Sequence, residues 1–405
     1  MTTPAFDLYS PAFHADPHAA YRRLRDEAPL YRLPAPHPIH VLTRHAHVAR
    51  LLADDRMTMN IMAWEGRAPL AAGDPRARIL REAMTSMATQ DGAAHARLRK
   101  LVNKGFAPRA IASLEASLEK LVRDALAPLA RRDRFDLHRE FAQRIPVVTI
   151  ARLIGVPEED EERFATWAHR MIAAADPLAD DAATASGADS IDELYAYLGV
   201  LIEARRGEPR EDLLSRLLAA EEEGDRLTRD ELLSLCQVLL VAGAETTTNL
   251  IDLGVKALLD HPAELARLEQ GDGALLENAI EEMLRFDHPG KFLNRVPHED
   301  VRLESGDVLR ARSLVLLGIG SAQRDERVFS DADRFDVTRD LRESLAFGRG
   351  RHSCLGASLA RLEGKLALAA LMPWLAHLRY DPARLRWRQS LVVRGMESFP
   401  LEKTR

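Results

Sequence analysis

The sequence predicts a mainly α-helical fold with small β-sheets at its margins. Leucines and alanines recur at spacings of three and four among charged residues through most of the 405-residue chain, which is the pattern of amphipathic helices. Strand-like runs are few and lie near the ends of the chain, at 30–43, 307–320 and from 376 onward. No Gly/Ser-rich, Pro-rich or strongly charged linker divides the sequence, so we expect a single domain over residues 1–405.

The composition argues against several classes of partner. The 56 basic and 62 acidic residues give a net charge of −6, which offers no general attraction for nucleic acid or an anionic membrane. The N-terminal segment has neither a signal-peptide pattern nor a membrane-spanning run, so we expect a cytoplasmic protein without a membrane anchor. The two cysteines, Cys236 and Cys354, cannot build a disulfide framework or a cysteine-rich zinc site. A special cysteine must therefore act alone.

The helical pattern is clearest at 112–131, 191–206, 211–222, 228–260 and 274–286. Between two such patterns, residues 176–190 are rich in small and acidic side chains. This stretch is typical of a mobile connection, and a simple surface loop is the equally good alternative.

The helix predicted at 228–260 breaks local rules at its centre. Thr228 and Glu231 form a capping box, and at 1.5 Å per residue the helix would run about 50 Å before Pro262 closes it. The segment "LLVAGAETTTNL" places Gly243, Glu245 and three threonines in its middle, although glycine costs about 0.5–1 kcal/mol there. Residues that disfavour a helix are expected at functional sites, and a buried polar kink in a core helix is the alternative.

A glycine-rich basic loop, "AFGRGRHSCLGASLARLE" (346–363), holds Cys354 just before an apolar helix. Its glycines let the backbone approach something flat or bulky. A thiolate there would face free backbone N–H groups and the positive end of a helix dipole, so Cys354 is placed as a metal ligand or as a nucleophile with His352 as base. A buried inert cysteine is the alternative.

The loop carries every fixed position of the signature F-G-x-G-x-H-x-C-x-G. These positions are Phe347, Gly348, Gly350, His352, Cys354 and Gly356. The chain therefore resembles the bacterial, soluble cytochromes P450, a family of haem-thiolate monooxygenases. The resemblance implies a P450 fold, with haem b between the long central helix and the cysteine-loop helix. It also implies that Cys354 is the iron ligand and that the other signature residues bind the cofactor.

Two further motifs extend the resemblance. "EEMLR" supplies Glu282 and Arg285 of the family's E-x-x-R pattern, and Arg334 in "DADRFD" is expected to complete their buried, structural charge network. "HARLR" supplies His95 and Arg99, which together with Arg295 and His352 are expected to bind the haem propionates.

The segment "AGAET" resembles the family's oxygen-activating segment. Ala242 and Gly243 would lie beside the haem, where Gly243 allows a local distortion and a groove for dioxygen. Thr246 would hold the dioxygen by hydrogen bonds and Glu245 would relay protons from solvent, so we assign both as catalytic with Cys354. The expected substrate contacts are Val238, Val241, Ala242, Gly290, Lys291 and Met396. Gly290 would open space over the haem, and Lys291 would meet either an acidic or hydroxylated substrate or water.

The implied reaction inserts one atom of dioxygen into an apolar or amphipathic small molecule, such as a steroid, terpenoid, polyketide or fatty acid. Electrons from NAD(P)H would arrive through a ferredoxin or flavodoxin with its reductase, and we expect a monomer. A basic patch for that partner is predicted from Arg97, Lys100, Lys104, Arg349, Arg351, Arg361 and Lys365. The alternatives are a peroxide-driven or nitric-oxide-reducing enzyme, against which Glu245 and Thr246 argue, and a haem protein that only binds or senses a ligand.

Overall fold

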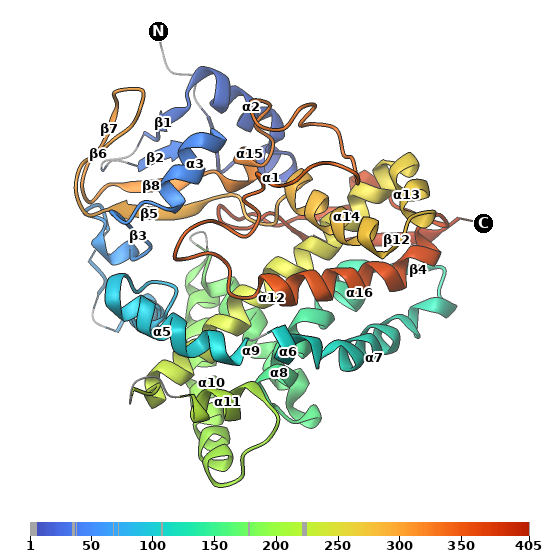
Figure 1. Cartoon of the computed structure of the whole chain (residues 1–405), viewed down its shortest axis with the longest axis horizontal. Coiled ribbons are helices and arrows are strands. Elements are labelled where there is room, and N and C mark those ends of the chain that lie inside the picture. The colour runs from blue at the N-terminus through green and yellow to red at the C-terminus, as the bar shows by residue number, and fades with distance from the viewer. Residues whose placement is uncertain are drawn as a thin grey trace.

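One long helix, α12 (Arg229–Asp260), runs through the middle of the helical part of the molecule (Figure 1). The computed structural model describes residues 6–34, 37, 39–67, 69–71, 73–106, 108–176, 179–220 and 225–404, and the side chains of 81–84, 104, 108 and 109 are outside this description. The strands within 30–58 and 293–317 lie to one side of α12, near the N-terminus, the strands at 134–136 and 400–403 lie near the C-terminus, and the helices within 161–219 lie on the other side of α12 (Figure 1).

The remaining helices have the following bounds: α1 (Pro11–Ala15), α2 (His18–Glu27), α3 (His45–Leu52), α4 (Pro75–Thr85), α5 (Gly92–Gly105), α6 (Pro108–Ala112), α7 (Glu115–Leu126), α8 (Arg144–Ile154), α9 (Glu161–Ala174), α10 (Asp181–Gly207), α11 (Leu213–Ala219), α13 (Pro262–Glu269), α14 (Gly273–Phe286), α15 (Ile319–Ala322) and α16 (Ala357–Leu375). Short 3₁₀ or π turns are η1 (Ile61–Ala63), η2 (Leu129–Arg131), η3 (His138–Ala142), η4 (Glu158–Asp160) and η5 (Pro382–Arg384). The prediction of a mainly helical fold is confirmed.

The largest sheet has five strands in the order β1-β2-β8-β5-β3, with bounds β1 (Leu30–Arg32), β2 (Ile39–Leu42), β3 (Met57–Thr58), β5 (Leu293–Pro297) and β8 (Leu314–Leu317). Within this sheet as described, the β2–β8 pair is parallel and the pairs β1–β2, β5–β8 and β3–β5 are antiparallel. The smaller sheets contain β4 (Arg134–Asp136), β6 (Val301–Arg302), β7 (Val308–Leu309), β9 (Leu378–Arg379), β10 (Arg386–Trp387), β11 (Met396–Ser398) and β12 (Pro400–Lys403). The predicted strand regions near both ends are thereby confirmed, and β5 fixes Arg295 opposite Val315.

Helix α12 begins as the sequence predicts. The Thr228 hydroxyl accepts a hydrogen bond from the backbone N–H of Glu231, and the Glu231 carboxylate accepts one from the N–H of Thr228. By length and composition α12 could cross a membrane, but 67% of its most apolar window is buried within the protein, as in a core helix.

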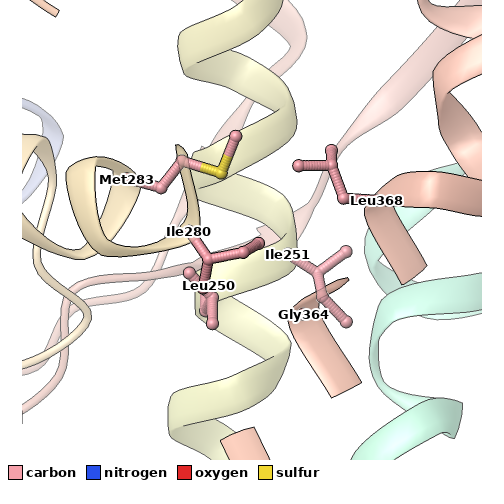
Figure 2. A pocket seen from close by; sticks show the side chains of 6 residues that line it. All are labelled: Leu250, Ile251, Ile280, Met283, Gly364 and Leu368. Carbon is pink, nitrogen blue, oxygen red and sulfur yellow. The ribbon is translucent and has the colours of Figure 1, made fainter. Parts of the chain in front are cut away.

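Helix α16 packs along α12, and α14 joins them (Figure 2). The contact is close because Gly364 has no side chain: a Cβ there would lie 3.0 Å from Leu250 Cδ2. The three helices leave a void of only ≈10 Å³, lined by Leu250, Ile251, Ile280, Met283, Gly364 and Leu368. This dense packing fixes the position of α16, and hence of the cysteine loop before it, relative to α12.

The prediction of a mobile connection or surface loop at 176–190 is wrong for residues 181–190, which form the first turns of α10. The Asp180 side chain caps the helix by accepting from the N–H of Ala183 at 2.7 Å. The small residues serve close packing against α9, since a Cβ on Gly187 would lie 2.1 Å from Ala174 Cβ. Low side-chain volume here reflects contact between helices rather than a loop.

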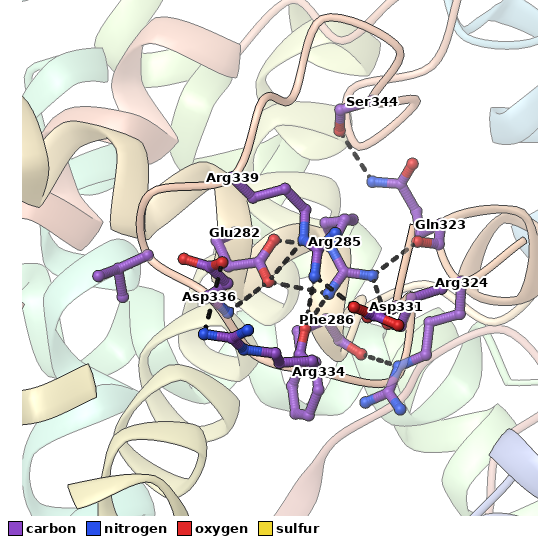
Figure 3. Close-up of polar contacts among 12 residues, drawn as sticks. Glu282, Arg285, Phe286, Gln323, Arg324, Asp331, Arg334, Asp336, Arg339 and Ser344 are labelled. Atoms are coloured by element: carbon purple, nitrogen blue, oxygen red, sulfur yellow. Dashed lines mark hydrogen bonds and ion pairs between the residues drawn. The ribbon is translucent and has the colours of Figure 1, made fainter. Parts of the chain in front are cut away.

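A buried charge network ties α14 to the chain that leads to the cysteine loop (Figure 3). Glu282 and Arg285, both fully buried, are joined by two hydrogen bonds of 2.6 and 2.8 Å. Arg285 also donates to the carbonyls of Gln323 and Ala332, while Glu282 accepts from the N–H of Asp336. A desolvated pair needs such additional bonds to be stable, and the structural role expected of Glu282 and Arg285 fits this geometry.

The expectation that Arg334 completes this network through its side chain is wrong. The Arg334 side chain is 58% exposed, and it contributes only its carbonyl, which accepts from Arg285. Arg339 takes the expected place: its side chain is 9% exposed, and its Nε lies 3.3 Å from Glu282 Oε1. The turn through 331–336 directs Arg334 outward and returns the chain so that Arg339 points inward (Figure 3).

These two arginines provide a matched test. Arg339→Leu should lower the free energy of unfolding by about 3–5 kcal/mol, because it removes the second cation from a buried carboxylate. Arg334→Leu should change it by less than about 0.5 kcal/mol, as is usual for an exposed side chain. Denaturant unfolding of both variants measures this difference, and equal losses would contradict the assignment of Arg339 to the network.

Candidate functional site

The cysteine loop is held in shape by its backbone. The Cys354 N–H donates to the Phe347 carbonyl at 2.8 Å, and Gly348 and Gly350 adopt φ values of +71° and +80° that side chains disfavour. At Gly350 a Cβ would also lie 3.0 Å from the Leu52 carbonyl oxygen and from Ala53 Cα. Gly356 differs, because a Cβ there would meet nothing within 4 Å and would project into open space.

Cys354 is accessible to solvent but is surrounded by protein on most sides. The side chain is exposed, yet the surrounding protein desolvates the thiol and raises its pKa. The N–H of Gly356 and the charges of Arg99 and Arg361 act in the opposite direction and favour the thiolate. Cys236, in contrast, is buried in α12 and burial raises the pKa of its thiol to about 12, which makes it the inert cysteine of the two.

Four predicted propionate ligands, two arginines and two histidines, form a cluster at this loop, and the two arginines carry its positive charge. The rings of His95 and His352 lie 4.3 Å apart, and Arg99 Nη1 donates to the carbonyl of Ser353 at 3.0 Å. Burial lowers the pKa of His95 to about 4, with repulsion from His352 and Arg99 adding to it. Burial likewise lowers the pKa of Arg295 to about 10, although Asp91 opposes this.

The charge of the cluster is only partly compensated. Asp91 accepts from His352 Nε2 at 3.1 Å. Arg295 donates from Nη1 to the carbonyl of Asn294. A guanidinium carries five N–H donors, so Arg295 and Arg99 retain donors for an anion. A buried excess of positive charge is stabilised by bound carboxylates.

One face of α12 opens to space in the middle of an otherwise buried helix. Ala242 and Thr246, four residues apart, are both exposed, and Val238 and Val241 are half-buried beside them. The Thr246 hydroxyl donates to the carbonyl of Ala242 at 2.8 Å, which uses its proton but leaves its oxygen able to accept. Glu245 lies on the adjacent side of the helix and is buried.

Gly243 does not have the environment expected of it. Residues 229–260 form an unbroken helix, and a Cβ on Gly243 would lie 2.6 Å from Ile150 Cδ1 of α8. The glycine therefore permits close packing of α12 against α8, and the expected local distortion of α12 stays a prediction.

Three of the expected substrate contacts are wrong. Lys291 is 1% exposed and its Nζ is bonded to His14 Nδ1 and to the Ser390 carbonyl, both at 2.8 Å, so it faces neither substrate nor water. Burial lowers the pKa of its amine to about 7. A Cβ on Gly290 would meet the His288 ring at 3.3 Å, so no space opens there. Met396 is 0% exposed and packs in the main core.

The other three expected contacts, Val238, Val241 and Ala242, lie on α12. Val238 and Val241 line a cavity of ≈220 Å³ between α4, α9, α10 and α12, together with Ile79, Met171 and Ile191. Its lining is mostly apolar, with Ser86, Thr89 and Gln237 as the polar side chains.

The predicted basic patch is largely compensated by carboxylates of the same chain. Arg97 pairs with Asp225 and Glu231, and the further pairs are Arg349–Glu343, Arg351–Asp55, Arg361–Glu281 and Lys365–Glu277. Lys100 is also engaged within the protein, and the side chain of Lys104 lies outside the described residues. These pairs fit the alternative that some of these charges belong to ordinary solvated helix faces, and the docking role of the patch stays a prediction.

The residues present fit a haem. The exposed Cys354, the open space at Gly356, the cluster of two arginines and two histidines and the exposed face of α12 would supply an iron ligand, room for a flat ring, carboxylate-binding groups and one wall of the site. A haem iron with a cysteine thiolate ligand supplies oxygen activation, because the thiolate pushes electron density toward the metal. Fold and site together define a haem-thiolate protein.

Comparison with known proteins supports the assignment to the haem-thiolate proteins. The cytochrome P450 family profile matches residues 189–373. Vitamin D(3) 25-hydroxylase from Pseudonocardia autotrophica is 40% identical over 405 residues, covering 98% of this chain and 96% of the relative. The cytochrome P450 monooxygenase PikC from Streptomyces venezuelae is 38% identical over 399 residues, covering 96% and 91%. The structure of the Bacillus subtilis P450 PksS superposes with a TM-score of 0.89 at 32% identity, covering 99% of this chain and 100% of the other.

The chain belongs to the cytochrome P450 family and is a monooxygenase that uses haem and dioxygen.

Several polar residues near the site lie outside the motifs that the sequence displays. Asn249 and Asp252 follow Glu245 on one face of α12, a spacing that the sequence displays. His138 of η3, which pairs with Asp252, and Arg388, which pairs with Glu245, carry no recognisable local signal, because only the tertiary fold brings them to α12.

Proposed function

We propose that this enzyme hydroxylates a bulky, apolar small molecule in the cavity beside Val238 and Val241. The observation that carries the proposal is the ≈220 Å³ apolar cavity next to the exposed face of α12. Apolar walls with a few polar groups bind hydrophobic ligands and orient them. Relatives named for vitamin D(3) and for 6-deoxyerythronolide B support a secosteroid-like or macrolactone-like substrate over a flexible fatty acid.

Cys354 is proposed as the iron ligand, with His95, Arg99, Arg295 and His352 binding the propionates. Thr246, whose hydroxyl oxygen can accept a hydrogen bond at the open face of α12, would hold a water or dioxygen there. Glu245 would then supply protons from its buried position next to this face. The proton relay favours dioxygen-dependent monooxygenation over peroxide-driven chemistry.

The electron donor is proposed to be NAD(P)H acting through a separate ferredoxin or flavodoxin and its reductase. Because the cations around the cysteine loop are paired within the chain, long-range charge attraction is not the basis of this proposal. Docking would depend on the shape and local contacts of the surface over Cys354.

The substrate class is tested by titrating the ferric holoprotein with vitamin D(3), 6-deoxyerythronolide B and palmitic acid while recording the Soret band. Vitamin D(3) and 6-deoxyerythronolide B should shift the spin state at lower concentration than palmitic acid.

Val241→Phe should weaken the binding of these two ligands about tenfold by filling the cavity, since overpacking costs about 1–3 kcal/mol. Val200→Phe, the same change on an exposed surface of α10, should not. Tighter binding of palmitic acid, or an equal effect of both variants, would contradict the proposal.

The role of Thr246 is tested by measuring product formed per NAD(P)H consumed. Thr246→Ala should reduce product formation by about 10²-fold, a typical contribution of positioned proton transfer, while reducing equivalents are still consumed. Thr248→Ala is the matched control. The Thr248 hydroxyl also donates to the carbonyl four residues earlier, that of Ala244, at 2.9 Å, but Thr248 is buried away from the open face. Unchanged coupling in Thr246→Ala would remove the assigned role.

A further inference from the structure

Lys291 is a buried amine that has no part in the proposed reaction. Its Nζ atom lies 2.8 Å from His14 Nδ1 of α1 and 2.8 Å from the carbonyl oxygen of Ser390. Lys291 and His14 are each only 1% exposed, and His14 Nε2 is buried without a hydrogen-bond partner among the described residues. Two basic side chains that are far apart in the sequence therefore meet in a buried contact.

This contact joins α1 to the loop 388–395, which connects β10 and β11. The backbone N–H of Lys291 donates to the carbonyl of Val392 at 2.8 Å, and the N–H of Arg394 donates to the carbonyl of Pro289 at 2.7 Å. The Lys291 amine adds the bond to Ser390. Lys291 thus holds the loop through its backbone and its side chain, and it holds α1 through His14.

Helix α1 has a second attachment that does not respond to pH. Arg394 Nη1 donates to the carbonyls of His14 and Ala15 at 2.7 and 3.0 Å, and the ring of Phe13 packs against Phe292. A guanidinium keeps its proton in proteins, and aromatic packing involves no titrating group. The Lys291–His14 contact differs, because both of its members can gain a proton near neutral pH.

The number of protons on this pair decides how well it fits its surroundings. When both groups are neutral, the amine has two N–H donors, which match two acceptors, the Ser390 carbonyl and His14 Nδ1. One added proton places a net positive charge in a buried position, which is costly. A second proton turns His14 Nδ1 into a donor that faces the donors of the ammonium group. Each added proton therefore weakens the contact.

The surrounding charges agree with this order. Burial, with repulsion from Arg394, lowers the pKa of the Lys291 amine to about 7, and burial with repulsion from Lys291 lowers the pKa of His14. Asp287 acts in the opposite direction on Lys291, but Arg394 and His18 already bind its carboxylate. The charged groups that face the pair from other elements are Asp176 beyond α9, Asp287 beyond α14 and Arg394 of the loop.

We propose that the Lys291–His14 contact is a pH-sensitive latch, which fastens α1 to the loop 388–395 and loosens as the pH falls. The latch lies near the end of α9 that lines the substrate cavity, because Asp176 directly follows Ala174 and Ala175 of the cavity lining. Loosening of α1 frees the loop at this end of the cavity. The latch acts in the resting protein and does not depend on the nature of the substrate.

Falling pH favours the open form because the open form binds more protons. A solvated lysine amine has a pKa of 10.5, whereas that of Lys291 in the closed form is about 7. Between these two values the open form carries a proton that the closed form lacks, so the ratio of open to closed molecules rises about tenfold for each unit of falling pH. The ratio rises again below pH 6.5, where the open form also protonates His14.

Amide hydrogen exchange in the resting ferric holoprotein tests the latch. After correction for the intrinsic exchange rate, the protection of residues 10–16 and 388–395 should fall by at least about tenfold from pH 9 to pH 7, while that of α16 stays constant. Lys291→Met removes the titrating amine and should abolish this fall. Lys120→Met is the matched control on α7, where the Lys120 side chain is 68% exposed, and should keep it.

Two further variants complete the test. Lys291→Gln also lacks the titrating amine but keeps two N–H donors, so it should abolish the fall if Lys291→Met does not fold. His14→Gln keeps an acceptor for the amine, and it should abolish only the additional loss of protection below pH 6.5.

Equal protection of α1 at pH 9 and pH 7 in the wild type would overturn the latch. An undiminished fall in the folded variant that lacks the Lys291 amine would do the same. A loss of protection below pH 6.5 that persists in His14→Gln would exclude His14 as its second titrating member.

Discussion

The buried pair of Glu282 and Arg285 is the interaction on which the geometry of the site depends. Arg285 binds the carbonyl of Gln323, and the Gln323 side chain in turn accepts from the N–H of Leu345 at 2.8 Å and donates to the Ser344 hydroxyl at 2.9 Å. Two residues further on, the Phe347 carbonyl accepts from Cys354. One desolvated ion pair thus anchors the chain that carries the cysteine. A buried pair is costly to desolvate, so its value lies in the specific conformation that its bonds enforce.

Helix α12 has both an exposed face and buried polar side chains, which are rarely found together in a core helix. Ala242 and Thr246 open one face to the proposed haem site, while Glu245, Asn249 and Asp252 hold a buried polar stripe next to it. Polar groups in a helix core are tolerated only when partners compensate them, and here η3 and the segment around Arg388 supply those partners. The helix continues from 229 to 260 despite Gly243 and the threonines, and it packs closely against α8 at Gly243 and against α16 at Gly364. The departure from helix propensity seen in the sequence therefore coincides with two neighbouring polar environments.

The sequence predicted the parts of this arrangement that local patterns encode. Helix α12 and its capping box, the glycines around Cys354 and the pairing of Glu282 with Arg285 follow from spacing and motif. The errors concern features that the path of the chain in space decides. Arg334 and Arg339 differ only in which way a turn directs them, and Lys291 is buried because the N-terminal helix α1 covers it with His14. Residues 181–190 resembled a loop because small side chains suit both loops and tightly packed helices.

The central claim is that Cys354 binds haem iron as a thiolate. It is tested most directly by the absorption spectrum of the purified holoprotein, reduced and exposed to carbon monoxide. Thiolate ligation predicts a strongly red-shifted Soret band, which Cys354→Ala should abolish and Cys236→Ala should retain. A Soret band at the position typical of imidazole or neutral-thiol ligation in the freshly reduced, folded protein would contradict the claim.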